Sequence, residues 1–258
     1  MRRGVRLGLL GAGVYLVALA IQVPAAWVVH WGQGAIPEGV TVSGVQGSLW
    51  HPTIDRFAVD LPRSGRLQGG PLEARIAVWQ LLRGRLGAEL EAAALGGEAS
   101  GRAAMGWGGN WRVPRAEANL PLTRLGEVDP RLDFGQGGAL EVTAEGLRGT
   151  RFPDAGSLRG TLREFRLPSF GPEGSYGTYR GEAEIGGPGD VQGRVSTASA
   201  RLLGFQGDFQ ADLAAGTARF DGEAWVPDGA PAEARQVLAL FGEIQDGRTA
   251  IRWQGRLP

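Results

Sequence analysis

The hydrophobic pattern of this chain opens with one long apolar run. No charged side chain occurs between Leu7 and Pro37, and residues 7–29 are apolar except for interruptions such as Gln22 and Pro24. A helix needs about 20 apolar residues to cross the hydrocarbon core of a bilayer. The run therefore predicts an N-terminal transmembrane helix over residues 7–29.

The charges around this run predict its orientation. Three arginines lie within residues 1–6, and the next charged residue after the run is Glu38. Because cytoplasmic flanks carry the excess of Lys and Arg, residues 1–6 are expected to be a cytoplasmic tail and residues 32–258 to lie across the membrane. Trp27 and Trp31 occupy the position where aromatic rings favour the headgroup region.

The same stretch also has features of a cleaved signal peptide. It has a charged start and an apolar core, and Val23-Pro24-Ala25 offers small residues for cleavage. Pro24 is unfavourable near a cleavage site, and the apolar run continues to Val29, which favours a retained helix. The sequence leaves open whether the segment is retained or cut near Ala25.

Beyond the apolar run, apolar and polar residues alternate in many short segments. Period-two alternation is typical of a strand with one buried face. The segments with this pattern are residues 40–43, 57–61, 74–78, 88–94, 116–120, 140–145, 158–163, 220–226 and 251–253. Turn-forming residues separate them, including Gly186 to Asp190 and Ser169 to Gly174.

Helical spacing is clearest near the end of the chain. Val237, Leu240 and Phe241 share one helical face, Pro231 fits a first turn, and Gly242 can cap the C-terminus. Asp246-Gly247 then predicts a two-residue turn. Two further short helical segments or irregular connections are expected at residues 79–83 and 121–132.

The composition supports a folded, mainly β domain. Gly makes up 44 of 258 residues, yet 43% of the chain is hydrophobic, which a disordered chain would lack. We expect a curved, mostly antiparallel sheet or sheets, forming a β-groove, a sandwich or a partly open barrel, with one short C-terminal helix. The pattern does not decide between a closed core and an open apolar groove.

The residue types present offer little for catalysis. The chain has no Cys and no Lys, its only histidines are His30 and His51, and it has no G-x-S-x-G elbow. Glu182 and Glu184 alternate on an expected strand, as in a solvated face. We therefore predict no enzyme, and no catalytic, cofactor-binding or metal-binding residue. The 27 arginines balance 27 acidic residues, which gives nucleic-acid binding no support.

Three segments of the chain carry a resemblance to a known family. The first joins Val23–Trp27 to the string G-V-T-V-S-G-V-Q-G-S-L-W at residues 39–50. The second is V-W-Q-L-L-R-G-R-L at residues 78–86. The third is the tail, with residues 236–242, then D-G-R at 246–248 and I-R-W at 251–253. In this order they resemble the type II secretion system protein N family of Gram-negative bacteria.

The first string departs from the family pattern at Val42 and Ser48, the second is shorter after Trp79, and the third has Ile251 in place of Leu. The centre, residues 96–216, aligns poorly. The resemblance implies a single-pass inner-membrane protein with a periplasmic β-rich domain. It implies an accessory, non-enzymatic part of the secretion machine, whose partners are other components of that machine, with no catalytic residues.

Two other functions stay open at this point. A curved sheet with one apolar face predicts a lipid-binding β-groove that bridges or shuttles lipid in the cell envelope. Cleavage near Ala25 would instead release a secreted binding module. The sequence does not indicate the oligomeric state, the partner protein or the strand edge that it uses.

Overall fold

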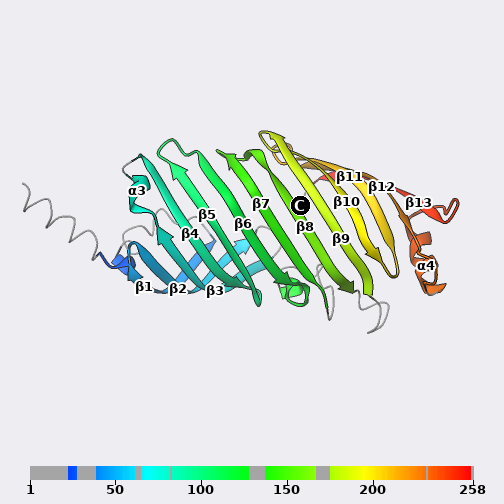
Figure 1. The fold of residues 1–258 in the computed structure, drawn as a ribbon, viewed down its shortest axis with the longest axis horizontal. Helices are drawn as coiled ribbons and strands as arrows, with labels where there is room; N and C mark the ends of the chain where they lie inside the picture. The colour runs from blue at the N-terminus through cyan, green and yellow to red at the C-terminus, as the bar shows by residue number, and fades with distance from the viewer. Residues whose placement is uncertain are drawn as a thin grey trace, which may run out of the picture.

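The fold is one large antiparallel sheet in which every strand pairs with the next strand along the chain. The computed structural model describes residues 23–27, 39–61, 65–81, 83–127, 137–166, 175–230 and 232–256. Thirteen strands lie side by side in chain order (Figure 1). They are β1 (Val40–Ser48), β2 (His51–Leu61), β3 (Gly65–Ile76), β4 (Arg85–Ala94), β5 (Gly97–Gly106), β6 (Trp111–Pro121), β7 (Ala139–Gly149), β8 (Pro153–Arg166), β9 (Ser175–Gly187), β10 (Asp190–Ala200), β11 (Gly204–Asp212), β12 (Thr217–Trp225) and β13 (Arg248–Arg256).

The prediction of a mainly β, antiparallel fold is confirmed. In the described residues the strands form a single open sheet with edges at β1 and β13. The sandwich alternative is therefore wrong, because no second sheet is present among these residues. Alternation along each strand could not decide this, since a strand has the same pattern whether its apolar face meets another sheet or an open groove.

Four short helical segments lie outside the ladder among the described residues. Three of them are α3 (Val78–Leu81), the 3-10 helix η2 (Leu122–Glu127) and α4 (Ala232–Phe241), and residues 25–27 form the fourth. α4 confirms the predicted C-terminal helix, and Gly242 follows it with a φ of 151°. Asp246 and Gly247 form the predicted turn, both with positive φ, and close a bridge between Gln245 and Arg248. The turn predicted at Ser169 to Gly174 lies outside the described residues.

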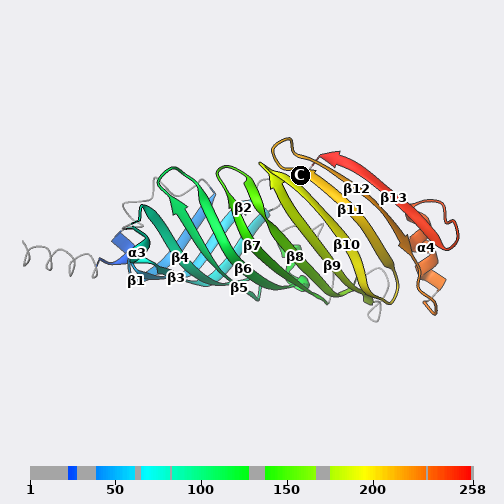
Figure 2. The same ribbon diagram turned by 45° about the horizontal axis from the view of Figure 1, so that its top comes forward.

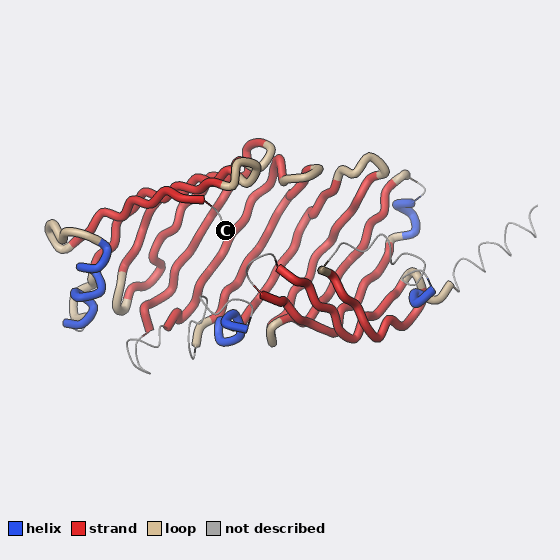
Figure 3. The backbone as a smooth tube through the Cα atoms, turned by 180° about the vertical axis from the view of Figure 1, so that it is seen from behind, coloured by secondary structure: helices blue, strands red, loops and turns tan. Residues whose placement is uncertain are grey.

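The sheet curls strongly at its N-terminal end. β3 pairs with β4 only from Gly69 onward, with a register shift between Gly69 and Leu72. Gly70, at a φ of 148°, lies where an added Cβ would meet the Asp55 backbone, so only glycine fits this bend. As a result β1 to β3 cross behind the next strands in Figure 1 and in front of them in Figure 3.

The two faces of the sheet differ in chemistry. One face carries Glu, Arg, Asp and Gln, and the other carries Ala, Gly, Val, Leu and aromatic residues. A buried cluster of Ala183, Ile185 and Val191 marks the centre of the apolar face, where Leu158 and Phe209 pack against it. At the C-terminal end, Ala224 on β12, Thr249 on β13 and Leu238 on α4 are all fully or nearly fully buried. Figure 2 shows α4 beside β13.

Aromatic rings on the apolar face lie over glycines of neighbouring strands. Gly207 pairs with Gly222, and the Phe220 ring covers both, so an added Cβ would lie 2.3 Å and 2.6 Å from its Cζ atom. Phe209 covers Gly193 and Phe57 covers Gly69 in the same way. The high glycine content thus has a packing role, because it lets large rings lie flat along the sheet.

The predicted transmembrane helix at residues 7–29 lies outside the described residues except for 23–27. Among the described residues, no helix is both long and apolar enough to cross a membrane. The short segment 23–27 joins the sheet, because Pro24 bridges to Ser48 and the Leu49 amide donates to the Val23 carbonyl at 2.8 Å.

We expect Gly207→Ala to destabilise the fold because its Cβ would displace the Phe220 ring. Overpacking of this kind costs about 1–3 kcal/mol, which urea denaturation followed by circular dichroism would measure. Gly186→Ala is the matched control, since an added Cβ there meets nothing within 4 Å. Phe220→Leu combined with Gly207→Ala should recover part of the loss. Equal stability of the Gly207 and Gly186 variants would contradict the packing role.

Candidate binding surfaces

The polar face of the sheet is organised as cross-strand rows of charge. Acidic and basic residues that face each other across neighbouring strands form ion pairs, such as Glu89 with Arg102 at 2.8 Å and Arg194 with Asp208 at 2.8 Å. The hydrogen bond with Asp208 raises the pKa of Arg194. These side chains are mostly exposed, so each pair adds little stability and is screened by salt.

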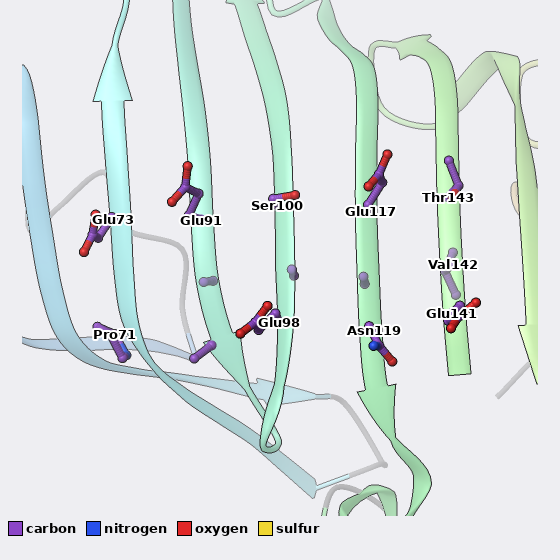
Figure 4. Close-up of a pocket in the computed structure, with 14 residues that line it drawn as sticks. Pro71, Glu73, Glu91, Glu98, Ser100, Glu117, Asn119, Glu141, Val142 and Thr143 are labelled. Atoms are coloured by element: carbon purple, nitrogen blue, oxygen red, sulfur yellow. The ribbon is translucent and has the colours of Figure 1, made fainter. Parts of the chain in front are cut away.

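A hollow of about 720 Å³ lies on this polar face, across β3 to β7 (Figure 4). Five glutamates line it together with hydroxyl and amide groups: Glu73, Glu91, Glu98, Glu117, Glu141, Ser100, Asn119 and Thr143. Arg115 pairs with Glu117 at 2.5 Å and Arg163 with Glu141 at 2.8 Å. The hollow remains acidic and favours groups that are basic or donate hydrogen bonds.

Most of the titratable residues that the sequence analysis singled out lie apart from one another in the structure. Glu182 and Glu184 lie exposed on β9, as expected for a solvated strand face. His51 is exposed at the start of β2, and its amide donates to the Ser48 hydroxyl at 3.3 Å. His30 lies outside the described residues. Within the described ranges, no group of three or more His, Cys, Asp or Glu residues is placed to hold a metal ion.

Sequence reasoning missed the acidic hollow. Its glutamates come from five strands, and Glu73 and Glu141 are far apart in the chain. Glu91, Glu117 and Glu141 lie in segments whose alternation was recognised and whose polar positions include Glu, which was the available signal, whereas Glu73 and Glu98 lie outside those segments. Only the register of four consecutive strand pairs brings these side chains to one place.

The apolar face is only partly covered. Leu90 on β4, Val142 on β7 and Ile251 on β13 keep intermediate exposure although they lie on the face opposite the charges. α4 covers this face only at the β12–β13 end, where it contacts β13. A long strip of apolar surface therefore crosses the sheet with no second layer over it in the described part of the chain.

Two tyrosines of β9, Tyr176 and Tyr179, are buried. The Tyr179 hydroxyl donates to the Leu203 carbonyl at 2.8 Å, and the Tyr176 ring packs against Phe165 at 5.5 Å between centroids. Burial raises the pKa of Tyr176 to about 12. Burial, and then the neighbouring Tyr176, also raise the pKa of Tyr179.

The two edges of the sheet differ in how far they are covered. On β1, the Pro24 bridge to Ser48 covers one end. On β13, Arg248 exchanges both backbone hydrogen bonds with Gln245, so its amide and carbonyl point away from β12. Because successive residues of a strand point their backbone groups to opposite sides, Arg252, Gln254 and Arg256 also direct theirs outward. Among the described residues, no strand pairs with them.

Comparison with known proteins identifies one family. A family model described as type II secretion system (T2SS), protein N matches residues 38–252. No curated protein and no solved structure matches the chain. The match covers most of the chain and includes β1 to β12 and the first part of β13, so it extends through the central region that the motif strings do not align.

The buried tyrosines predict a loss of stability at alkaline pH. Their pKa is raised in the fold, whereas an unfolded tyrosine ionises near pH 10, so stability is full below about pH 10 and falls as the pH rises toward about 12. Lys and Cys are absent from the chain, so tyrosines are the side chains that titrate in this window.

Tyr179→Phe should reduce this alkaline slope. Below pH 10 the same variant should lose about 1 kcal/mol, because the Leu203 carbonyl loses its hydrogen-bond donor. Urea titrations at several pH values would measure both effects. Tyr176→Phe combined with Tyr179→Phe should flatten the slope further, and an unchanged slope in that double variant would show that these tyrosines are not buried as described.

Proposed function

Because its residues 38–252 match the family model, the chain belongs to the type II secretion system protein N family, and we propose that it is a non-enzymatic accessory component of that secretion machine. It is held in the inner membrane by residues 7–29 as a single-pass helix. Its N-terminus is cytoplasmic and its β domain is periplasmic. The family match carries this proposal, and the apolar run with its flanking arginines supports the topology.

The domain acts by contact with other proteins of the machine. The polar face holds exposed ion pairs and no cluster of titratable groups placed for catalysis in the part of the chain that the structure describes. The open edge of β13 supplies unpaired backbone groups, which can accept an extended strand from a partner. Side-chain alternation on β13 then selects the partner strand, with Ile251 and Trp253 on one face and Arg252 on the other.

Charge favours an acidic strand as this partner. Within the sheet, arginines face carboxylates on the neighbouring strand, as Arg252 faces Asp221 at 3.8 Å. β13 itself holds three arginines and no acidic residue. A partner strand with acidic residues on one face and apolar residues on the other would extend both the charged face and the apolar face of the sheet.

A second candidate function follows from the uncovered apolar strip. An open sheet with one apolar face can hold acyl chains, so a lipid-binding groove is the alternative role. Extraction of the purified full-length protein with organic solvent, followed by mass spectrometry, tests it. Stoichiometric lipid that is lost from a Val142→Glu variant would support the groove, whereas no bound lipid in the wild type would count against it.

The secretion role predicts a specific pattern of co-purification. The full-length chain, isolated from membranes of cells that express the whole secretion machine, should bring other components of that machine with it. Arg252→Pro should weaken this association at least about tenfold, since its ring blocks the outward side of β13. It should leave the β12–β13 ladder intact, because the Arg252 amide does not point toward β12.

Two control variants distinguish the contribution of the β13 backbone from that of the Arg252 charge. Arg252→Ala keeps the amide and removes only the guanidinium, so it should weaken the association less than Arg252→Pro. Ile251→Pro removes a donor that points toward β12 and should instead lower stability. If the wild type associates with no component of the machine, the proposed function fails. If all three variants associate as well as the wild type, the edge of β13 is not the contact.

A further inference from the structure

Large exposed apolar side chains gather at one end of strands β4 and β5. We call this group the tryptophan rim: Val78, Trp79, Leu86, Met105 and Trp107. Trp79 is 79% exposed and Trp107 is 82% exposed. Leu86 pairs directly with Met105, and an added Cβ on Gly84 would lie 3.0 Å from the Trp107 ring. Leu86, Met105 and Trp107 thus lie close together, and α3, which carries Val78 and Trp79, contacts the adjoining strand β4.

The rim lies at the same end of the sheet as residues 23–27, which belong to the C-terminal part of the predicted membrane helix and join the sheet. Backbone hydrogen bonds connect the two, from Leu49 to the Val23 carbonyl, from Ile76 to the Trp50 carbonyl and from Ala77 to the Gly87 carbonyl, each at 2.8 Å. Trp27, at the end of that segment, is also strongly exposed. Figure 2 shows α3 close to this first described segment.

Charge around the rim has one sign. Residues 77–88 and 103–116 contain no acidic residue, and they include Arg83, Arg85 and Arg112, all exposed. Exposed tryptophans beside arginines are the composition of surfaces that rest in the headgroup region of an anionic bilayer. Farther along β4 and β5, and on β10 and β11, arginines pair with carboxylates instead.

We propose that the tryptophan rim is a membrane-contacting surface, with Trp79 and Trp107 inserted among anionic lipid headgroups and the neighbouring arginines at the phosphates. The contact gives the β domain a fixed orientation, with α3 and the first strands at the bilayer and β13 directed away from it. This inference rests on the proposed anchor, since the anchor brings this end of the sheet to the membrane.

The alternative occupant of such a patch is another protein. Lipid is the favoured occupant because the rim lies at the same end of the sheet as residues 23–27 of the predicted membrane helix, and because residues 77–88 and 103–116 carry only basic charge. If a protein covered this surface, a fluorescent label placed on the rim would not contact lipid. The vesicle experiment that follows therefore separates the two occupants.

The absence of Cys makes a direct test simple. Trp79→Cys and Trp107→Cys are each introduced into the full-length chain and labelled with an environment-sensitive fluorophore. The matched control is Trp253→Cys, an exposed tryptophan nine strands away, about 40 Å across the sheet. Each protein is reconstituted into vesicles of phosphatidylethanolamine and phosphatidylglycerol that carry a headgroup-level quencher.

Labels at 79 and 107 should be quenched severalfold more than the label at 253, and replacing phosphatidylglycerol by phosphatidylcholine should reduce the difference.

Flotation of the vesicles reports separately on the anchor. Protein that floats but shows equal quenching at all three positions overturns the rim contact and leaves the anchor standing. Protein that does not float overturns both. Labels at 79 and 107 that are quenched no more than the label at 253, and whose emission changes only when other secretion components are added, identify a protein contact and overturn the lipid contact.

Discussion

The structure depends on how a single layer of strands protects its apolar face. Strand alternation places polar residues on one side and apolar residues on the other, and in most folds a second layer covers the apolar side. In the described part of this chain there is one sheet of thirteen strands, with α4 over only one end. Curvature of the sheet and close packing of side chains within it must therefore protect the apolar face, which a second layer does in most folds.

Glycine and aromatic residues make this close contact possible. Where a neighbouring strand has no side chain, a ring such as Phe220 or Phe209 can lie flat and bury the backbone beneath it. Glycine also allows the sharp bend of β3 that turns β1 to β3 across the next strands. The unusual glycine content and the aromatic residues are thus two parts of one packing arrangement.

This arrangement explains why the notable features of this domain are surfaces that can interact with other molecules. An open meander leaves an unpaired edge at β13, an uncovered apolar strip and a charged outer face with an acidic hollow. Each of these surfaces is available to bind a partner. Membership of a secretion-system family agrees with a domain that works by contact.

The sequence alone determined the mainly β class, most strands, the C-terminal helix, the Asp246-Gly247 turn and the family, because these depend on local periodicity, turn chemistry and short motifs. It could not decide that the sheet stays open, since alternation is the same in a sandwich and in a groove. Nor could it place Glu73, Glu91 and Glu141 around one hollow, or Trp79 and Trp107 at the same end of strands β4 and β5. Those groupings depend on strand register and on the bend at Gly70, which exist only once distant segments pair.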